Sequence, residues 1–555
     1  MSQQNIPVIL LKEGTQRTKG KEAQQNNIRA ALAIAEAVKS TLGPKGSDKM
    51  LVDSLGDIVI TNDGATILDE IDVEHPAAKL MTQIAKTQDD QAGDGTTTAV
   101  VLAGELLKQA STLIELGVHP SIIISGYKKA VDKATEILTE IAMDVDPKDK
   151  KTLKKVADTA LNSKIVSIHK DIMSNIAIDA ILQVADERNG KYLADLDWIK
   201  VVQKAGQSLD QTELIEGVLL DKEVVHPGMP KKIEKAKIAL IDENIEIQKT
   251  EISAEIKIEE SNQMKAFLDR EQEMIEDMVK KIIDSGANVL LCQKGIDDLA
   301  QHFLAKAGIL SVRRVKKSDM EKLARATGGK IVSSIDDLSK DDLGIAGKVE
   351  EIKIGDESNV LISDSKKAQS VTVLIRGGSK YITDEAERAL HDALCVVRDV
   401  VEDQKIVAGG GASEVEIAKQ LRSLAESIGG REQLAIEKFA IALEVIPKVL
   451  TENAGLDAID LLTNIRAKHS EAKNIVYGLD LFKGKIVNLE RAGILEPLRV
   501  KSQAVRSATE AAELILRIDD VIAAKEKEGG EMPPGGMPGG MPGGMPPGGM
   551  PPGMM

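Results

Sequence analysis

The chain has 555 residues, more than a single hydrophobic core supports, so we expect about three domains. Its 72 lysines and arginines are outnumbered by 88 aspartates and glutamates, and the net charge of −16 disfavours nucleic acid or an anionic membrane as a partner. Only 2% of the residues are aromatic, so the cores must be packed mainly with Ala, Val, Ile and Leu.

Cysteine usage and the N-terminal residues predict a cytoplasmic protein. Cys292 and Cys395 lie far apart in apolar surroundings, as in proteins of a reducing compartment. The short apolar run at residues 7–11 is followed, not preceded, by its first lysine, so it does not predict a secretory signal. No run is apolar enough to span a membrane, and no set of cysteines and histidines has zinc spacing.

The first predicted helix, residues 27–40, ends at a glycine-rich turn that contains Leu42, Gly43 and Pro44. Such a turn can bring backbone N–H groups to a phosphate, although most turns of this kind only redirect the chain. Residues 59–61 predict a strand that leads into residues 62–64, the pattern of a hairpin or of a strand–turn–helix unit. Both interpretations place Asp63 at an exposed tip, where a turn-forming role is expected of it.

Residues 94–98 form the most informative motif. The helix that follows is too apolar to lie on a surface, so its start is predicted to be buried. Asp94 is predicted to be the N-cap, Gly95 permits close backbone approach, and three threonines place hydroxyls beside N–H groups that have no intrahelical acceptor: Thr96, Thr97 and Thr98. The motif is either an ordinary capped helix or an anion site where Asp94 holds Mg²⁺ against a phosphate.

The pattern then changes from helical to β-rich. Helices are predicted over 104–142 and 156–185, and the second is interrupted by a loop at 161–164 that presents Lys164 to solvent. Short β runs alternate with helices from residue 217 to 375, which predicts an α/β domain inserted between helical parts. Residues 261–282 form an amphipathic helix that either packs on this domain or projects toward another chain.

A second informative helix is predicted over residues 384–401. Its start, Asp384 to Glu387, has the spacing of a capping box, and Asp392 lies off the apolar stripe, as a solvated carboxylate would. A triple glycine at 409–411 opens further helical patterning to about residue 524. Residues 529–555 are mainly Gly, Pro and Met and predict a disordered tail, which either touches unfolded chains through its methionines or has no role.

No Walker-type or Rossmann phosphate pattern occurs, so a nucleotide would bind by another design. The segments 41–46, 61–64, 93–98 and 408–411, together with Asp392, closely resemble the chaperonins in content and order, over essentially the whole chain. The methionine-rich tail and the 261–282 helix also resemble those of group II chaperonins, the family of archaeal thermosome subunits and of the eukaryotic cytosolic chaperonin.

The resemblance implies a multi-domain α and α+β chaperonin fold with three domains. These are a mainly helical equatorial domain (1–147 and 405–528), a small α/β intermediate domain (148–216 and 369–404) and an α/β apical domain (217–368) with a helical lid protrusion at about 243–282. The tail (529–555) follows them. It also implies like or paralogous subunits in a double ring of eight or nine per ring.

The resemblance further implies a site for ATP and Mg²⁺, in which Asp94 binds the metal and Asp392 acts on the attacking water beside a second carboxylate, Asp63. The nucleotide-binding residues that it implies are Leu42, Gly43, Pro44, Asp94, Gly95, Thr96, Thr97, Thr98, Lys164, Gly410 and Glu496. Phosphoryl transfer depends mainly on positioning and charge neutralisation, which suits this set.

The function implied is that of an ATP-dependent molecular chaperone that encloses unfolded polypeptide in a chamber with a built-in lid. Two other functions fit some of the same residues. A small-molecule kinase or ligase would need an acceptor pocket but neither the tail nor the protrusion, and a scaffold would use its ATP site only to control ring or filament assembly. Refolding of a denatured protein with ATP distinguishes these functions.

Overall fold

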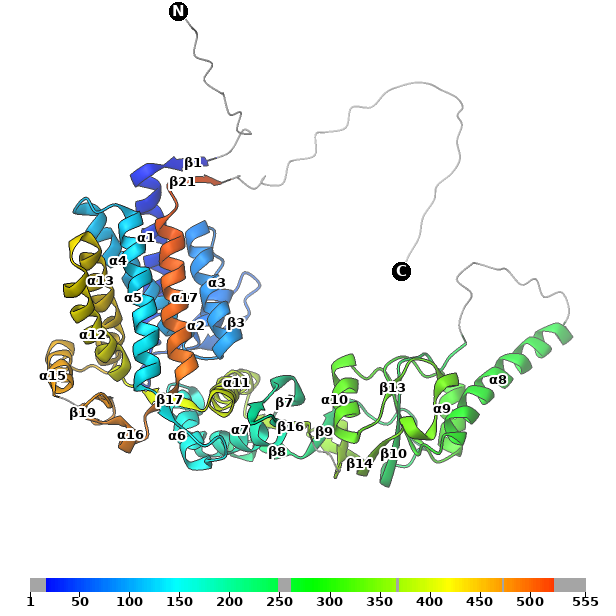
Figure 1. The fold of residues 1–555 in the computed structure, drawn as a ribbon. Helices are drawn as coiled ribbons and strands as arrows, with labels where there is room; N and C mark the ends of the chain where they lie inside the picture. Colours follow the sequence, from blue (N-terminus) through cyan, green and yellow to red (C-terminus); the bar gives the residue numbers. More distant parts are fainter. Residues whose placement is uncertain (1–15, 248–260, 366–368, 472–473, 524–555) are drawn as a thin grey trace, which may run out of the picture.

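The computed structural model describes residues 16–247, 261–365, 369–471 and 474–523 (Figure 1). The predicted tail at 529–555 and the part of the predicted lid protrusion at 248–260 lie outside these residues. No helix within the described ranges is both long and apolar enough to cross a membrane.

A helical bundle, built from both ends of the chain, forms the largest part. Helix α4 lies at its centre and packs against α1, α3, α13 and α17 (Figure 1). The buried side chains are almost all aliphatic, as the scarcity of aromatic residues predicts. The bundle helices are α1 (Gly20–Lys39), α3 (Pro76–Ala92), α4 (Thr96–Glu115), α5 (Pro120–Ile141), α12 (Ala412–Ile428), α13 (Gly430–Leu443) and α17 (Leu498–Leu516).

Smaller elements surround the bundle. Antiparallel pairs join β1 (Gln16–Lys19) to β21 (Asp520–Ala523), β2 (Lys49–Val52) to β3 (Ile58–Thr61), and β18 (Tyr477–Asp480) to β19 (Lys485–Asn488). A three-stranded sheet has the order β20 (Leu495–Pro497), β17 (Lys405–Ala408) and β4 (Met143–Asp144). The remaining short helices here are α2 (Gly64–Glu70), α14 (Val445–Asn453), α15 (Ala458–Ser470) and α16 (Leu489–Ala492).

A connecting region lies between the bundle and the β-rich part (Figure 1). Its helices α6 (Lys150–Leu161) and α7 (Lys170–Val184) pack on α11 (Lys380–Asp403), which comes from much later in the chain. Two small sheets complete it, with the orders β7 (Ile199–Ala205), β16 (Val371–Gly377), β8 (Glu213–Ile215) and β5 (Asp186–Arg188), β6 (Lys191–Leu193).

The β-rich part is a seven-stranded mixed sheet with the order β12-β11-β10-β14-β15-β9, and β13 also pairs with β10. The two faces of the sheet contribute to separate aliphatic cores. Its strands are β9 (Gly217–Leu220), β10 (Lys232–Ile241), β11 (Val289–Cys292), β12 (Leu310–Val312), β13 (Ile331–Val332), β14 (Gly344–Ile354) and β15 (Glu357–Ser363), and its helices are α8 (Ser261–Asp284), α9 (Asp298–Lys306) and α10 (Lys317–Thr327).

Helix α8 is the predicted amphipathic helix, and its two halves lie in different surroundings. Its C-terminal half packs on the sheet through Ile275, Val279 and Ile282, which are at most 2% exposed. Its N-terminal half extends away from the sheet (Figure 1). The helix therefore both belongs to the domain and projects from it.

The predicted fold class is confirmed, because a mainly helical part and an α/β part occur in the predicted order. Two local predictions are wrong. Residues 384–387 do not cap a helix, because α11 already begins at Lys380 with Ser379 as its N-cap. Helical structure does not reach residue 524, because α17 ends at Leu516 and the strand β21 follows.

Candidate active site

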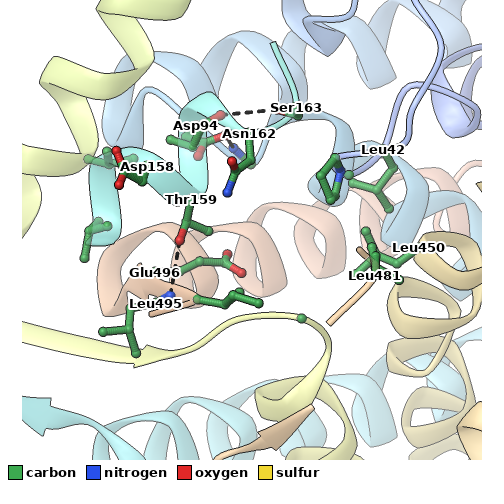
Figure 2. Close-up of a pocket in the computed structure, with 18 of the residues that line it drawn as sticks. Leu42, Asp94, Asp158, Thr159, Asn162, Ser163, Leu450, Leu481, Leu495 and Glu496 are labelled. Carbon is green, nitrogen blue, oxygen red and sulfur yellow. Dashed lines mark hydrogen bonds between the residues drawn. The ribbon is translucent and has the colours of Figure 1, made fainter. Parts of the chain in front are cut away.

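A cavity of about 500 Å³ lies where the bundle meets the connecting region (Figure 2). It is lined by parts of both, including the turn after α1, the start of α4, the end of α6 and the strand β20. The predicted nucleotide-binding residues all line this cavity: Leu42, Gly43, Pro44, Asp94, Gly95, Thr96, Thr97, Thr98, Lys164, Gly410 and Glu496. The fold thus brings together residues that are up to 454 positions apart, from 42 to 496.

The start of α4 supplies unpaired backbone donors to the cavity. The N-cap is Gly95, with φ of +79°, and the first intrahelical bond is Ala99 N to Gly95 O at 3.0 Å. The N–H groups of residues 96–98 therefore have no backbone acceptor in the described parts of the chain. The prediction that Asp94 is the N-cap is wrong, since its Oδ1 accepts instead from the adjacent Gly95 N at 2.6 Å.

Two glycines allow the backbone to approach closely around this helix start. A Cβ on Gly95 would lie 2.9 Å from Cγ1 of Val500 in α17. A Cβ on Gly64 would lie 2.5 Å from the Oγ1 of Thr97. The donors of α4 therefore lie in a narrow concavity that larger residues would fill, which fits a phosphate group and, beside the Asp94 carboxylate, a bound cation.

Asp63 forms the wall next to this helix start. Residues 58–70 form the strand–turn–helix unit, one of the two predicted alternatives, and Asp63 caps α2 by accepting from Thr66 N at 2.8 Å. Its other oxygen accepts from Thr96 Oγ1 at 3.2 Å. Burial raises the pKa of Asp63, but the charge of Lys164 and the bonds from Thr66 outweigh it and lower the pKa overall. The predicted exposed tip is thus wrong, because the carboxylate is half-buried and ionised.

Lys164 and Asp392 form a buried ion pair, with Nζ and Oδ2 2.7 Å apart and side chains only 7% and 9% exposed. The local sequence pattern predicted both side chains to be solvated, which is wrong. Asp392 is buried because α11 is enclosed on most of its circumference, not only along one apolar stripe. The loop that carries Lys164 is held against the Asp63 turn, where Asn62 Nδ2 donates to the Ser163 carbonyl.

Each member of this pair stabilises the charged form of the other. Burial lowers the pKa of Lys164, but the carboxylates of Asp392, Asp63 and Asp94 raise it overall, so the lysine is a cation. Burial raises the pKa of Asp392 well above its usual value, and the charge of Lys164 opposes that rise. A carboxyl group with a raised pKa is suited to accept a proton near neutral pH.

Asp392 lines a second cavity, of about 240 Å³. Asp63 lines both cavities, and Asp89 and His391 also line the second. The two predicted catalytic carboxylates therefore meet at one small space, and the ion pair with Lys164 connects Asp392 to the larger cavity.

The side of the large cavity that contains Leu42 is apolar. Leu42, Leu450 and Leu481 lie together there, and Glu496 extends into the space between them and Thr159 (Figure 2). Gly43, with φ of +86°, packs so tightly that a Cβ would lie 2.3 Å from Leu450 Cδ2. The cavity thus offers an apolar wall, a carboxylate and the start of α4, a combination that would suit the base, sugar and phosphates of a nucleotide.

Sequence reasoning missed several residues of the site. Lys501 and Leu481 line the cavity without belonging to any motif, and Asn62 was considered only as a turn former. The signal that could have identified Lys501 was its position among apolar residues in a helix, because an unpaired lysine there is costly.

Comparisons with known proteins give a family and several relatives of this chain. Residues 34–526 match the TCP-1/cpn60 chaperonin family. The chain is 55% identical to thermosome subunit beta of Archaeoglobus fulgidus over 536 residues, which covers 96% of this chain and 98% of the relative. It is 56% identical to a thermosome subunit of Methanopyrus kandleri over 519 residues, or 94% and 95% of the two chains. The chain therefore belongs to the TCP-1/cpn60 chaperonin family.

Proposed function

We propose that this chain hydrolyses ATP in the large cavity and uses the reaction to drive the folding of other proteins. Its family makes it an ATP-dependent chaperone. The observation that carries the proposal for this site is the Lys164–Asp392 ion pair, which joins a cavity of nucleotide size to a buried carboxylate on a different region of the fold.

In this proposal the base lies against Leu42 and Leu450, Glu496 binds the ribose, and the start of α4 binds the phosphates. Asp94 would hold Mg²⁺, and that ion would neutralise charge that develops on the phosphate oxygens. Gly410, in the turn between β17 and α12, keeps the backbone close to the strand β18, because a Cβ there would lie 2.6 Å from the Leu479 carbonyl oxygen.

The attacking water would lie between Asp63 and Asp392, the two carboxylates at the second cavity. Asp63 is ionised and fixed by its bonds to Thr66 and Thr96, so it orients the water. Asp392 takes the proton at Oδ2 once Lys164 leaves it for the more negative phosphate. The lysine thereby couples the presence of the last phosphate to the state of the base.

Because Asp392 is on α11 while the phosphate-binding residues are on the bundle, hydrolysis depends on how these regions approach each other. We assign the bundle to an equatorial domain, the connecting region to an intermediate domain and the β-rich part to an apical domain, with boundaries near residues 147, 216, 368 and 404. The projecting half of α8 would contribute to a lid over a chamber in a double ring of eight or nine subunits per ring.

A refolding assay tests the proposal. A denatured client protein is incubated with the wild-type chain, Asp392→Ala and a control, Asp384→Ala, which removes a half-buried carboxylate from the same helix. Loss of a general base lowers turnover by at least about a hundredfold. We expect Asp392→Ala to bind ATP but to lose hydrolysis and refolding, while the control retains both.

Electron microscopy of the same samples shows whether each variant still forms rings. Equal refolding by the wild type and Asp392→Ala would refute the role of Asp392. Rings without refolding by any of the proteins would favour a scaffold, a function that the family membership does not favour.

A further inference from the structure

A second buried lysine, Lys501, lies at the same cavity and has two acidic partners. Its Nζ is 2.7 Å from Glu414 Oε1 and 2.9 Å from Glu496 Oε2. The side chains of Lys501 and Glu414 are only 7% and 4% exposed. Burial lowers the pKa of Lys501, but the two carboxylates raise it overall, so the lysine is charged at neutral pH.

Three separate elements meet at this lysine. Lys501 lies in the first turn of α17, Glu414 in the first turn of α12, and Glu496 in the strand β20, where it pairs with Val407 of β17. Each of these elements belongs to a packed core, so the positions of the three side chains are fixed by the fold.

Glu414 is not explained by charge balance alone. One lysine is enough to neutralise Glu496, yet a second carboxylate is buried beside it, and its Oε2 has no hydrogen-bond partner in the described parts of the chain. A buried carboxylate with an unpaired oxygen is costly. Glu414 therefore has a role that offsets this cost, and among the described residues its side chain is bound by the ammonium group of Lys501.

The contacts leave one oxygen of Glu496 available. Oε2 is bound by Lys501, whereas Oε1 accepts no hydrogen bond from any described residue. Oε1 also lies beside Gly409, where a Cβ would come within 2.5 Å of it, so only glycine leaves room for this orientation. The side chain extends into the large cavity (Figure 2).

We propose that Lys501, held in place by Glu414, is a positioning residue that fixes the Glu496 carboxylate to accept a hydrogen bond from a ribose hydroxyl. This inference rests on the proposed function, since it takes the ligand to be a nucleoside triphosphate. It adds a specificity: the site selects ribonucleotides over deoxyribonucleotides. A carboxylate paired with a lysine only accepts hydrogen bonds, so the analogue without the hydroxyl leaves an acceptor unpaired where the bound nucleotide shields it from water.

The test compares ATP with 2′-deoxyATP and 3′-deoxyATP as substrates, and the three corresponding diphosphates as ligands in calorimetry. A hydrogen bond to a charged group is worth roughly ten- to a hundredfold in affinity. We expect the wild type to prefer ATP by that factor over at least one deoxy analogue, which also identifies the hydroxyl that is bound. In Lys501→Met the preference should fall to within about twofold.

Two further variants make the result specific. Arg506→Met removes an exposed cation from the same helix and should retain the preference. If Lys501→Met does not assemble, the preference for ATP is measured in the double variant Lys501→Met/Glu414→Gln instead. This variant leaves no unpaired charge at position 414. A purely structural role of Lys501 would weaken all three nucleotides equally and leave their ratio unchanged.

The possible failures are distinguishable. If the wild type neither binds nor hydrolyses ATP, the proposed function is wrong. If the wild type binds ATP but does not discriminate against either analogue, or if the folded Lys501 variants still discriminate, the inference about Lys501 is wrong while the proposed function stands.

Discussion

Two buried lysines face the same cavity, and their surroundings differ. Lys164 lies in the short loop between α6 and α7 and pairs with one carboxylate, Asp392, on a different region of the fold. Lys501 lies within the long helix α17 and pairs with two carboxylates from packed neighbours, Glu414 and Glu496. A cation that has one partner and lies on a loop can exchange it for a phosphate, whereas a cation held by two partners between packed elements stays in place.

The comparison shows how one interaction type serves two purposes. In the proposed mechanism, breaking the first pair would free Asp392 as a general base, so that pair would have to be reversible. In the proposed role of Lys501, keeping the second pair would preserve the orientation of Glu496, so that pair would have to be permanent. The difference arises from where each lysine is placed and from how many carboxylates surround it.

The largest expected effect is on the response to ATP. Trp198 is the one tryptophan in the sequence, and its ring lies under the guanidinium of Arg325 in α10, 4.2 Å away, so its fluorescence reports on the junction with the β-rich part. We expect ATP to change this fluorescence in the wild type and in Lys501→Met at saturating nucleotide, but not in Lys164→Met, which cannot exchange partners.

Lys155→Met is the matched control for this measurement. Lys155 lines the same cavity from α6, is half-buried, and has no ion pair within the described residues. A normal fluorescence change in Lys164→Met, with ATP bound, would show that the lysine does not transmit the signal.

The unfolding free energy should depend more on Lys501 than on Lys164, the reverse of the order expected for the response to ATP. Removal of one partner of a buried ion pair costs about 3–5 kcal/mol of unfolding free energy. Lys501→Met should be the more destabilising of the two, because two carboxylates lose their counter-ion, whereas Lys164→Met leaves only Asp392 unpaired. Chemical denaturation followed by circular dichroism measures the difference.

Neutralising the carboxylate partner of each lysine as well should restore much of the lost stability. Lys164→Met/Asp392→Asn and Lys501→Met/Glu414→Gln leave fewer unpaired charges, so we expect both to be more stable than the corresponding single variants. Equal stability of the single and double variants would mean that the charges are hydrated in the unliganded protein, and the contrast between the pairs would then fail.

The sequence was sufficient to predict the fold class and a set of residues that line the cavity, because short motifs with glycine and threonine keep their local geometry. Gly95 is an example, since its positive φ and its contact with Val500 require glycine. The projecting helix α8 was also found from its one-sided apolar pattern, which identifies a helix with one exposed face.

The burial of charged residues could not be predicted from spacing. Helix periodicity assigns Asp392 to a polar face, but it does not reveal that other elements cover that face. The strand β21 was missed because its partner, β1, lies some 500 residues away, as in the pairing of Lys19 with Asp520. Both errors concern contacts between distant segments, which a local pattern does not contain.

The smallest predicted effect concerns Asp89, which lines the second cavity together with Asp63 and Asp392. Burial, together with the negative charges of Asp63 and Asp90, raises the pKa of Asp89 to about 6. The folded state therefore binds a proton more tightly than the unfolded state, so this contribution to stability is fully present at acidic pH. It is lost as the pH rises toward and through about 6.

Asp89→Asn should remove this dependence, and above pH 6 the variant should be more stable than the wild type by about 1–2 kcal/mol, after allowance for the partial exposure of the carboxyl group to water. Denaturation at pH 5 and pH 8 measures how the unfolding free energy changes with pH. The control is Asp132→Asn, which removes an exposed carboxylate from α5. The same pH dependence of the unfolding free energy in Asp89→Asn and the wild type would mean that the second cavity admits enough water to solvate its carboxylates. Asp392 would then depend on Lys164 less than the ion pair indicates, and the contrast between the two lysines would lose its basis in burial.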